Sequence, residues 1–386
     1  MGDYVRQLPH QGSADMARPP SAATRFHIDV PLLLLLSALT LYGLFVLYSA
    51  SGQDMGAVVR QGRYFVVGYV IMILAAQVSL ERYMRWSPWL YLVGIGTLVA
   101  VMFFGVGAKG AQRWLSIGGF RFQPSEIMKL VVPMAVAWYL ADRILPPRFK
   151  YVIAALVMLG LPALLILQQP DLGTALLIAA SGLFVLFMAG IGWRYIVGAV
   201  VLAIASAWPA WMFVLKDYQK QRILTMLNPE SDKLGAGWNI IQSKTAIGSG
   251  GWAGKGWMNG TQSQLDFLPE SHTDFIIAVL AEEFGLRGVL MLMGIYLLIL
   301  LRGFWIGVQS QSSFGRMMAG SLTLTFFVYI FVNMGMVAGL LPVVGVPLPL
   351  VSAGGTSVVT LMAGFGILMA VSTCLLYTSD AADEVV

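Results

Sequence analysis

The sequence predicts an all-α polytopic membrane protein with about ten transmembrane helices and a large extracytoplasmic loop between the seventh and eighth. Hydrophobic residues make up 58% of the 386 residues and charged residues only 11%, with a mean hydropathy of +0.76. Several apolar runs reach the ~20 residues that a helix needs to cross a bilayer. A transmembrane β-barrel is disfavoured, because its strands would alternate apolar and polar residues over about 10 positions.

The apolar runs define ten spans, and the flanking charges orient them. An even number of spans places both termini on one side of the membrane. Arg and Lys gather in short cytoplasmic loops, and an inside N-terminus puts eleven Arg and Lys residues inside against five in the short outer loops. We therefore expect a multi-pass protein with a cytoplasmic N-terminus. The predicted spans are 30–50, 62–80, 87–105, 125–143, 150–168, 171–190, 193–215, 274–301, 317–340 and 350–374.

The two ends of the chain lie outside this membrane domain, 30–374. Residues 1–29 are polar and rich in small residues and Pro, which predicts a flexible cytoplasmic tail. Residues 375–386 are acidic, and we interpret them as an atypical tail of foreign or misassembled sequence. The net charge of +5 follows from the loop residues, so nucleic acid is not an expected partner. A single cysteine, Cys374, excludes an intramolecular disulfide and a cysteine-based metal site.

Two outer segments are polar and basic. Residues 216–273 form a long glycine-rich loop, and loops of this length in compact proteins are usually functional. Residues 109–124 form a shorter one. The eighth span passes Gly285 and Gly288 and is longer than one crossing requires. We therefore expect it to bend there or to start above the hydrocarbon.

Asp274 stands where the long loop meets the eighth span, in the stretch Leu268–Phe275. Ionisable groups at a membrane are costly and mark functional sites. One interpretation is an N-cap, because Asp satisfies free N–H groups at a helix start. The other is a general base that deprotonates a sugar hydroxyl. His272 and Thr273 lie in the same turn, where a lone histidine is more often a hydrogen-bonded bystander.

Glu126 and Lys129 stand three residues apart at the start of the fourth span, after Gln123 and Pro124. That spacing fits an ion pair on one helix face. Charges at the end of a membrane helix also line polar cavities. Both interpretations remain open on the sequence alone.

Two further cations fit phosphate chemistry. Arg113 precedes Trp114, which is typical of the membrane interface, and a guanidinium matches phosphate oxygens in geometry. Lys244 precedes the glycine-rich run 248–251, whose backbone N–H groups suit a pyrophosphate. No Walker motif is present, so a nucleotide is not indicated.

Two polar motifs open other spans. Asp171 precedes the sixth span and is best explained as a helix cap. Ser352, in the stretch 352–357, opens the tenth span. Small residues there indicate either close helix packing or the lining of a polar cleft.

These motifs, in this order on a ten-span frame, resemble the RodA/FtsW (SEDS) family over nearly the whole chain. Each motif alone is weak, and the ordered set is specific. Within the family, the stretch 260–264 and the short N-terminal tail favour the elongation branch. The motifs are Ser49–Gly52, Gly110–Trp114, Phe122–Glu126, Gln169–Thr174, Gly248–Gly251, Phe267–Glu270, His272–Phe275, Pro342–Pro349 and Ser352–Gly355.

The resemblance implies an inverting peptidoglycan glycosyltransferase that polymerises lipid II outside the bacterial cytoplasmic membrane during elongation and rod-shape maintenance. It implies a class B penicillin-binding protein as transpeptidase partner, alongside other elongation-complex proteins. The family's essential aspartate falls on Asp274 and its charged pair on Glu126 and Lys129. The chain departs from the family at Ala353, where Tyr is usual, and in its acidic C-terminus.

We therefore assign Asp274 as catalytic. A divalent cation, Mg²⁺ or Mn²⁺, is expected with the substrate pyrophosphate, and no organic cofactor is expected. The alternatives are a lipid II flippase, which needs charges near the membrane midplane, and a non-catalytic scaffold. The assigned substrate-binding residues are Arg113, Gln123, Glu126, Lys129, Lys244, His272, Thr273 and Ser352.

Overall fold

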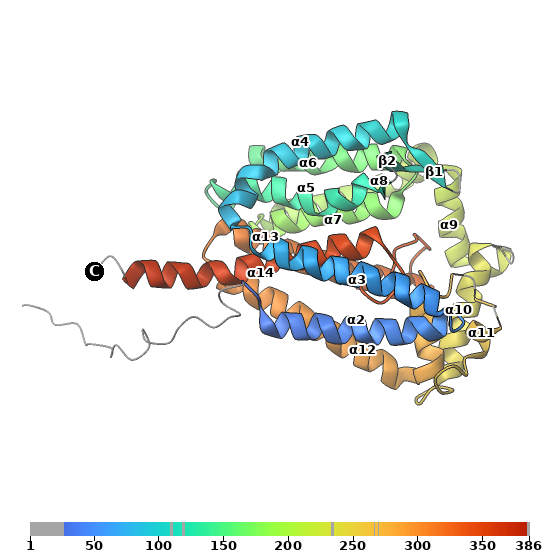
Figure 1. Cartoon of the computed structure of the whole chain (residues 1–386). Helices are drawn as coiled ribbons and strands as arrows, with labels where there is room; N and C mark the ends of the chain where they lie inside the picture. The colour runs from blue at the N-terminus through green and yellow to red at the C-terminus, as the bar shows by residue number, and fades with distance from the viewer. Residues whose placement is uncertain are drawn as a thin grey trace, which may run out of the picture.

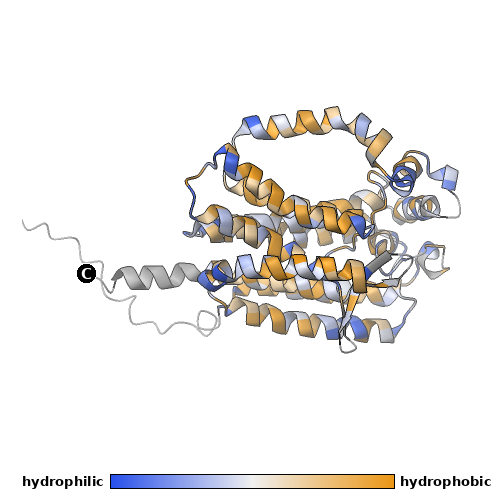
Figure 2. Cartoon of the chain, turned by 90° about the horizontal axis from the view of Figure 1, so that it is seen from above, coloured by the Kyte–Doolittle hydropathy of each residue, from blue (hydrophilic) through white to orange (hydrophobic). Residues whose placement is uncertain are grey.

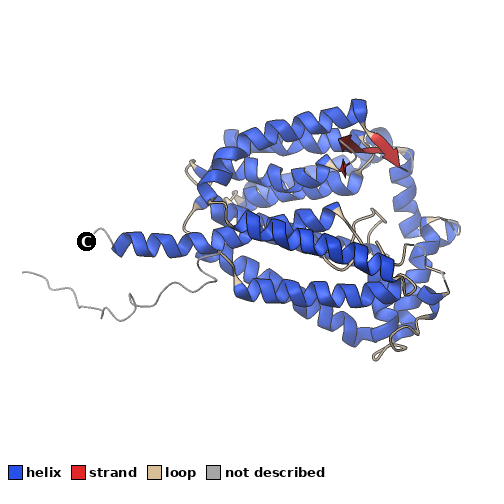
Figure 3. Cartoon of the chain, in the orientation of Figure 1, coloured by secondary structure: helices blue, strands red, loops and turns tan. Residues whose placement is uncertain are grey.

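The computed structural model describes residues 27–108, 111–117, 120–232, 235–265, 267–268 and 270–383. It forms a bundle of long, roughly parallel and antiparallel helices (Figures 1 and 3), and each predicted span coincides with one of them. The helices are α2 (Val30–Ala50), α3 (Met55–Ala76), α4 (Leu80–Phe104), α5 (Pro124–Ala141), α6 (Phe149–Gln168), α7 (Leu172–Met188), α8 (Trp193–Pro209), α12 (Ile276–Gln309), α13 (Ser313–Val337) and α14 (Thr356–Asp383).

The length and composition of these helices support a multi-pass membrane protein. Among the described residues, seven helices are long and apolar enough to cross a bilayer. Two shorter apolar helices, Leu172–Met188 and Thr356–Ser372, accompany them. Apolar residues also cover much of the outward-facing surface of the bundle (Figure 2). The predicted polytopic all-α fold is therefore confirmed.

Helix α13 lies at the centre of the bundle and contacts α5, α7, α12 and α14. Small residues allow the close approach, as is common between membrane helices. A Cβ at Gly303 of α12 would lie 2.4 Å from the Thr323 hydroxyl of α13. A Cβ at Gly320 of α13 would lie 2.3 Å from the Met188 sulfur of α7. In contrast, none of the residues of α8 is buried.

At one end of the bundle, an ion pair between Asp29 and Arg302 joins α2 to α12. Asp29 caps the start of α2 and accepts two hydrogen bonds from Arg302 of α12, at 3.1 and 2.7 Å. Ser372 of α14 donates to the same carboxylate at 3.1 Å. Asp29 is therefore part of the folded domain, although the predicted tail included it; residues 1–26 lie outside the described part.

The opposite end carries the segments that were predicted as loops. Residues 106–122 form a small antiparallel sheet of β1 (Val106–Ala108), β2 (Ala111–Ile117) and β3 (Phe120–Phe122). The long segment 216–273 is also folded in good part. It contains α9 (Asp217–Leu227), a 3₁₀ turn (Pro229–Asp232), α10 (Ala236–Gly250) and α11 (Thr261–Gln264).

The glycine-rich run at the end of α10 and the residues that follow it pack against α12 around a kink. Gly285 interrupts α12 with φ 62° and ψ −160°, so the predicted bend is confirmed. The backbone N–H groups of Lys255 and Gly256 donate to the carbonyls of Glu282 and Glu283, each at 3.0 Å. These groups are consumed within the protein, and Gly250 is a glycine because a Cβ would lie 1.9 Å from the Ala281 carbonyl.

Gly285→Ala is expected to destabilise the protein by roughly 1–3 kcal/mol or more, because a side chain is strained at this φ. The added Cβ would also lie 2.4 Å from the Gly254 nitrogen. The matched control is Gly294→Ala in the same helix, where nothing lies within 4 Å of the added carbon. Thermal unfolding in detergent should show a loss only for Gly285→Ala; equal melting temperatures would contradict the packing role of the kink.

Candidate active site

A polar cavity of about 270 Å³ opens at the end of the bundle that carries the sheet and the α9–α11 segment. Its walls come from the sheet, α5, α7, α13 and the segment between α13 and α14. Four of the predicted substrate-binding residues line it: Arg113, Gln123, Glu126 and Lys129. Together with the other lining residues they bring five sequence motifs to one cavity: Gly110–Trp114, Phe122–Glu126, Gln169–Thr174, Pro342–Pro349 and Ser352–Gly355.

Glu126 and Lys129 form a buried ion pair in the wall of this cavity. Pro124 occupies the first turn of α5, where its missing N–H is no loss, so the helix begins there and both charges lie on its first turns. The Lys129 ammonium lies 2.6 Å from a Glu126 carboxylate oxygen, and their side chains are 8% and 10% exposed. The ammonium also lies 5.1 Å from the centre of the Tyr329 ring of α13. Both sequence interpretations, ion pair and cavity lining, are correct.

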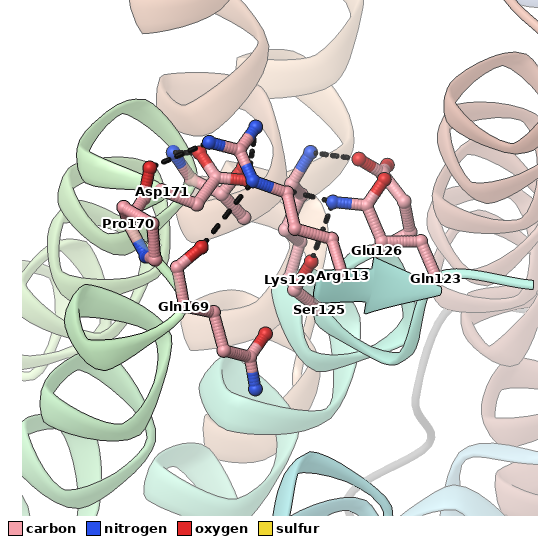
Figure 4. Close-up of polar contacts among 9 residues, drawn as sticks. Arg113, Gln123, Ser125, Glu126, Lys129, Gln169, Pro170 and Asp171 are labelled. Atoms are coloured by element: carbon pink, nitrogen blue, oxygen red, sulfur yellow. Dashed lines mark hydrogen bonds and ion pairs between the residues drawn. The ribbon is translucent and has the colours of Figure 1, made fainter. Parts of the chain in front are cut away.

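Arg113 extends from β2 across the cavity rim to the start of α7 (Figure 4). It donates hydrogen bonds to the carbonyls of Gln169 and Pro170 at 3.4 and 2.5 Å, and lies 3.5 Å from Asp171. Its side chain is 34% exposed, so it remains accessible from the cavity.

Asp171 joins the two sides of this rim. It accepts from the Thr174 N–H at 3.2 Å, which confirms the predicted cap of α7. Its other oxygen lies 3.5 Å from the Gln123 amide nitrogen, which also donates to Ser125 at 3.0 Å. Asp171 therefore orients both Arg113 and Gln123 in the cavity wall.

Asp274 lies beside the same cavity. The N-cap of α12 is Phe275, one residue beyond Asp274, so Asp274 does not occupy the N-cap position that the capping interpretation gave it. A Cβ at Gly345 would lie 3.5 Å from a carboxylate oxygen of Asp274. Because Gly345 lines the cavity, the half-buried carboxylate faces its wall.

The backbone around Asp274 is fixed by the segment that precedes α14. Three successive carbonyls accept hydrogen bonds: His272 from the Ala353 N–H at 2.9 Å, Thr273 from the Ser352 hydroxyl at 2.5 Å, and Asp274 from the Asn333 amide at 2.9 Å. The side chain of His272 is exposed, and that of Thr273 bonds to Glu270 at 2.9 Å.

Ser352 has a structural task in this arrangement. It is 2% exposed, donates its only proton to Thr273, and accepts from the Leu348 N–H at 2.9 Å. Its hydroxyl has no proton left for a substrate, so we reassign it from substrate binding to holding the loop. Lys244 lies apart from the cavity lining: its ammonium packs against Gly339 at the end of α13.

The sequence interpretation missed two residues of α13 that contribute to the site. Tyr329 lines the cavity beside Lys129. Asn333 is fully buried and bonds to Asp274. An amide in a predicted apolar span was a detectable signal, since polar groups inside membranes are costly and are usually bonded or functional.

Comparison with known proteins decides the family. The family model of FtsW, RodA and SpoVE, described as cell cycle protein, matches residues 30–376. The chain belongs to this family. It is 55% identical to the peptidoglycan glycosyltransferase MrdB of Escherichia coli K12, over 90% of this chain and 94% of that one. It is 38% identical to the probable peptidoglycan glycosyltransferase FtsW of Geobacter metallireducens, over 89% and 94%.

Solved structures of the FtsW/RodA/SpoVE family agree. One, from work on the structural coordination of polymerization and crosslinking by a peptidoglycan synthase complex, matches with a TM-score of 0.79 and 30% identity, over 89% of this chain and 97% of that one. The rod shape determining protein RodA of Thermus thermophilus matches with 0.67 and 28%, over 89% and 96%. The prediction of a peptidoglycan glycosyltransferase is thus confirmed at the level of family and enzyme class.

Lys129→Met is expected to destabilise the protein by about 3–5 kcal/mol, because it leaves the Glu126 carboxylate buried without its partner. Replacing both residues, Glu126→Leu with Lys129→Met, removes the charge from the interior and should return most of the stability. Unfolding in mixed detergent micelles measures both. A single variant as stable as the wild type would show that the pair is not the buried contact described.

Proposed function

We propose that this protein polymerises lipid II into glycan strands at the outer face of the bacterial cytoplasmic membrane. The supporting observation is the cavity at the α9–α11 end, which has Asp274 beside one wall and the cations Arg113 and Lys129 in others. Membrane topology places this end outside when the N-terminus is cytoplasmic, because α2 starts at the opposite end.

In the proposed reaction Asp274 is the general base. It takes the proton of the 4-hydroxyl of the acceptor sugar as that oxygen bonds to the anomeric carbon of the donor. The bond from this carbon to the pyrophosphate oxygen breaks, with inversion, and undecaprenyl pyrophosphate leaves. A positioned base of this kind contributes roughly 10²–10⁴-fold to a rate.

The leaving group carries negative charge that the cavity can stabilise. Arg113 presents a guanidinium at the rim, and Lys129 provides an ammonium deeper in the wall. Fixed cations aimed at developing charge stabilise the transition state more than they would in water. Gln123, His272 and Thr273 are proposed to contact the polar head group, and Lys244, which lies against Gly339 apart from the cavity lining, is not given a role in this reaction.

A divalent cation is proposed to enter with the substrate. Among the described residues no cluster of three His, Cys, Asp or Glu residues offers a complete metal site. Glu126 and Asp171 each face a cationic side chain instead. This donor set fits Mg²⁺ or Mn²⁺ held mainly by the pyrophosphate oxygens, which the ion would neutralise, with few protein ligands.

The proposed partner is a class B penicillin-binding protein, the transpeptidase of the elongation complex. Similarity to a chain from a peptidoglycan synthase complex supports a partner of this kind. The identity of 55% to MrdB, against 38% to an FtsW protein, supports the elongation branch and a role in rod shape. The flippase alternative is less favoured because the cavity's charges gather at the outer end of the bundle.

Asp274→Asn is expected to abolish glycan polymerisation from purified lipid II with the penicillin-binding partner, because an amide cannot accept the proton. The control is Asp217→Asn, an exposed carboxylate on α9 outside the cavity, which should polymerise normally. Normal strands from a folded Asp274→Asn protein would refute the base. If wild type bound to its partner made no strands but moved labelled lipid II across vesicles, a flippase would be indicated.

Arg113→Gln is expected to lower kcat by about 10²–10³-fold, the usual cost of removing a donor that stabilises developing charge. The matched control is Arg60→Gln, at a 69% exposed arginine at the start of α3. Polymerisation rates at saturating lipid II provide the measurement. Equal losses in the two variants would contradict a specific role of Arg113 at the leaving group.

A further inference from the structure

We infer that Asn333 is a positioning residue that holds Asp274 against the cavity wall; the inference rests on the catalytic role proposed above for Asp274. Asn333 lies on the last turns of α13 and is completely buried. Its amide nitrogen donates two hydrogen bonds, to the carbonyl of Asp274 at 2.9 Å and to the carbonyl of Val346 at 2.7 Å. One side chain thus joins the segment before α12 to the segment before α14.

The distance between the two bonded segments sets how far the Asp274 carboxylate lies from the cavity wall. Val346 follows Gly345, the residue that the Asp274 carboxylate faces, and both line the cavity with Pro347. The carbonyls of His272 and Thr273 are held by residues 352 and 353, which lie further along the same segment. Asn333 alone among these donors reaches Asp274 itself and the wall beside its carboxylate.

The chemistry of the amide explains why this position is Asn. Two carbonyl oxygens need two donors, and a single –NH₂ group supplies both from one atom. The Asn333 amide oxygen has no hydrogen-bond partner in the part of the chain that the structure describes. The donated bonds therefore set the orientation of the side chain. A buried amide is retained in an apolar helix only where such bonds compensate its burial.

Asn333 is fully buried, and both of its donated bonds go to the backbone of Asp274 and of Val346, so it acts through these residues rather than on the substrate. Displacing a reacting group by ~1 Å can cost about 100-fold in rate. The inference therefore predicts a loss in kcat with little change in KM, because the residues that contact the substrate stay in place.

The test is Asn333→Asp, which keeps the side-chain volume and replaces the donor nitrogen by an oxygen. The control is Ser321→Ala, which removes another buried bond of α13, to the Ser181 carbonyl at 2.7 Å, far along the helix. We expect Asn333→Asp to lower kcat about 100-fold at near wild-type KM, and Ser321→Ala to lower thermal stability with kcat retained. Equal kcat in Asn333→Asp and wild type would overturn the inference.

If Asn333→Asp does not fold, a second variant tests the positioning role. Asn333→Gln keeps the donors and moves them by one methylene, so kcat should fall less steeply with the fold intact; wild-type kcat in this variant would also overturn the inference. Asp274→Asn in the same assay separates the two ideas. An active Asp274→Asn protein refutes the proposed base, whereas an inactive one beside fully active Asn333 variants refutes only the positioning role.

Discussion

The buried ion pair between Glu126 and Lys129 is the constraint on which the cavity end of the bundle depends. Two charges below the rim of a membrane protein are tolerated only when they compensate one another. Here they also set a boundary. With Tyr329, the pair lines both the polar cavity and an apolar pocket that continues between α5, α13 and α14 toward Phe365 and Leu368. Polar chemistry is therefore confined to one side of the pair.

In the segment that precedes α12, main-chain hydrogen bonds hold the loops. The segment 251–256 pairs with the kink of α12 through main-chain groups, and glycines permit the approach. The Glu282 carboxylate adds a buried anchor by accepting from Lys255 at 2.7 Å, Thr261 at 3.0 Å and the Gln262 N–H at 3.1 Å. The segment 251–262 is thus tied to α12 at its kink.

The sequence was sufficient for the membrane fold because long apolar runs leave few alternatives to spanning helices. It also identified Glu126, Lys129 and Arg113, since charges are rare in such a chain; the first two lie at the start of a helix, and Arg113 lies in a polar connecting segment. It could not separate close packing from ligand binding for the run 248–251 and for Ser352, because glycine and serine serve both, and only the neighbouring segments decide between the two. Asn333 was missed because its partners lie elsewhere in the sequence, Asp274 at a separation of 59 residues and Val346 at 13. No local pattern links them.

The break in α12 at Gly285 divides the helix into a short buried part next to Asp274 and a longer part that faces outward. Residues 276–283 are buried, whereas the longer part beyond the kink presents Leu290, Leu297 and Leu301 outward. Membrane helices adjust their tilt to the local hydrocarbon thickness. Because the helix is interrupted, the outward-facing part can follow the thickness of the bilayer while the short segment next to Asp274 keeps its register with α13. The segment beside the proposed base is thereby separated from the part of the helix that faces the lipid.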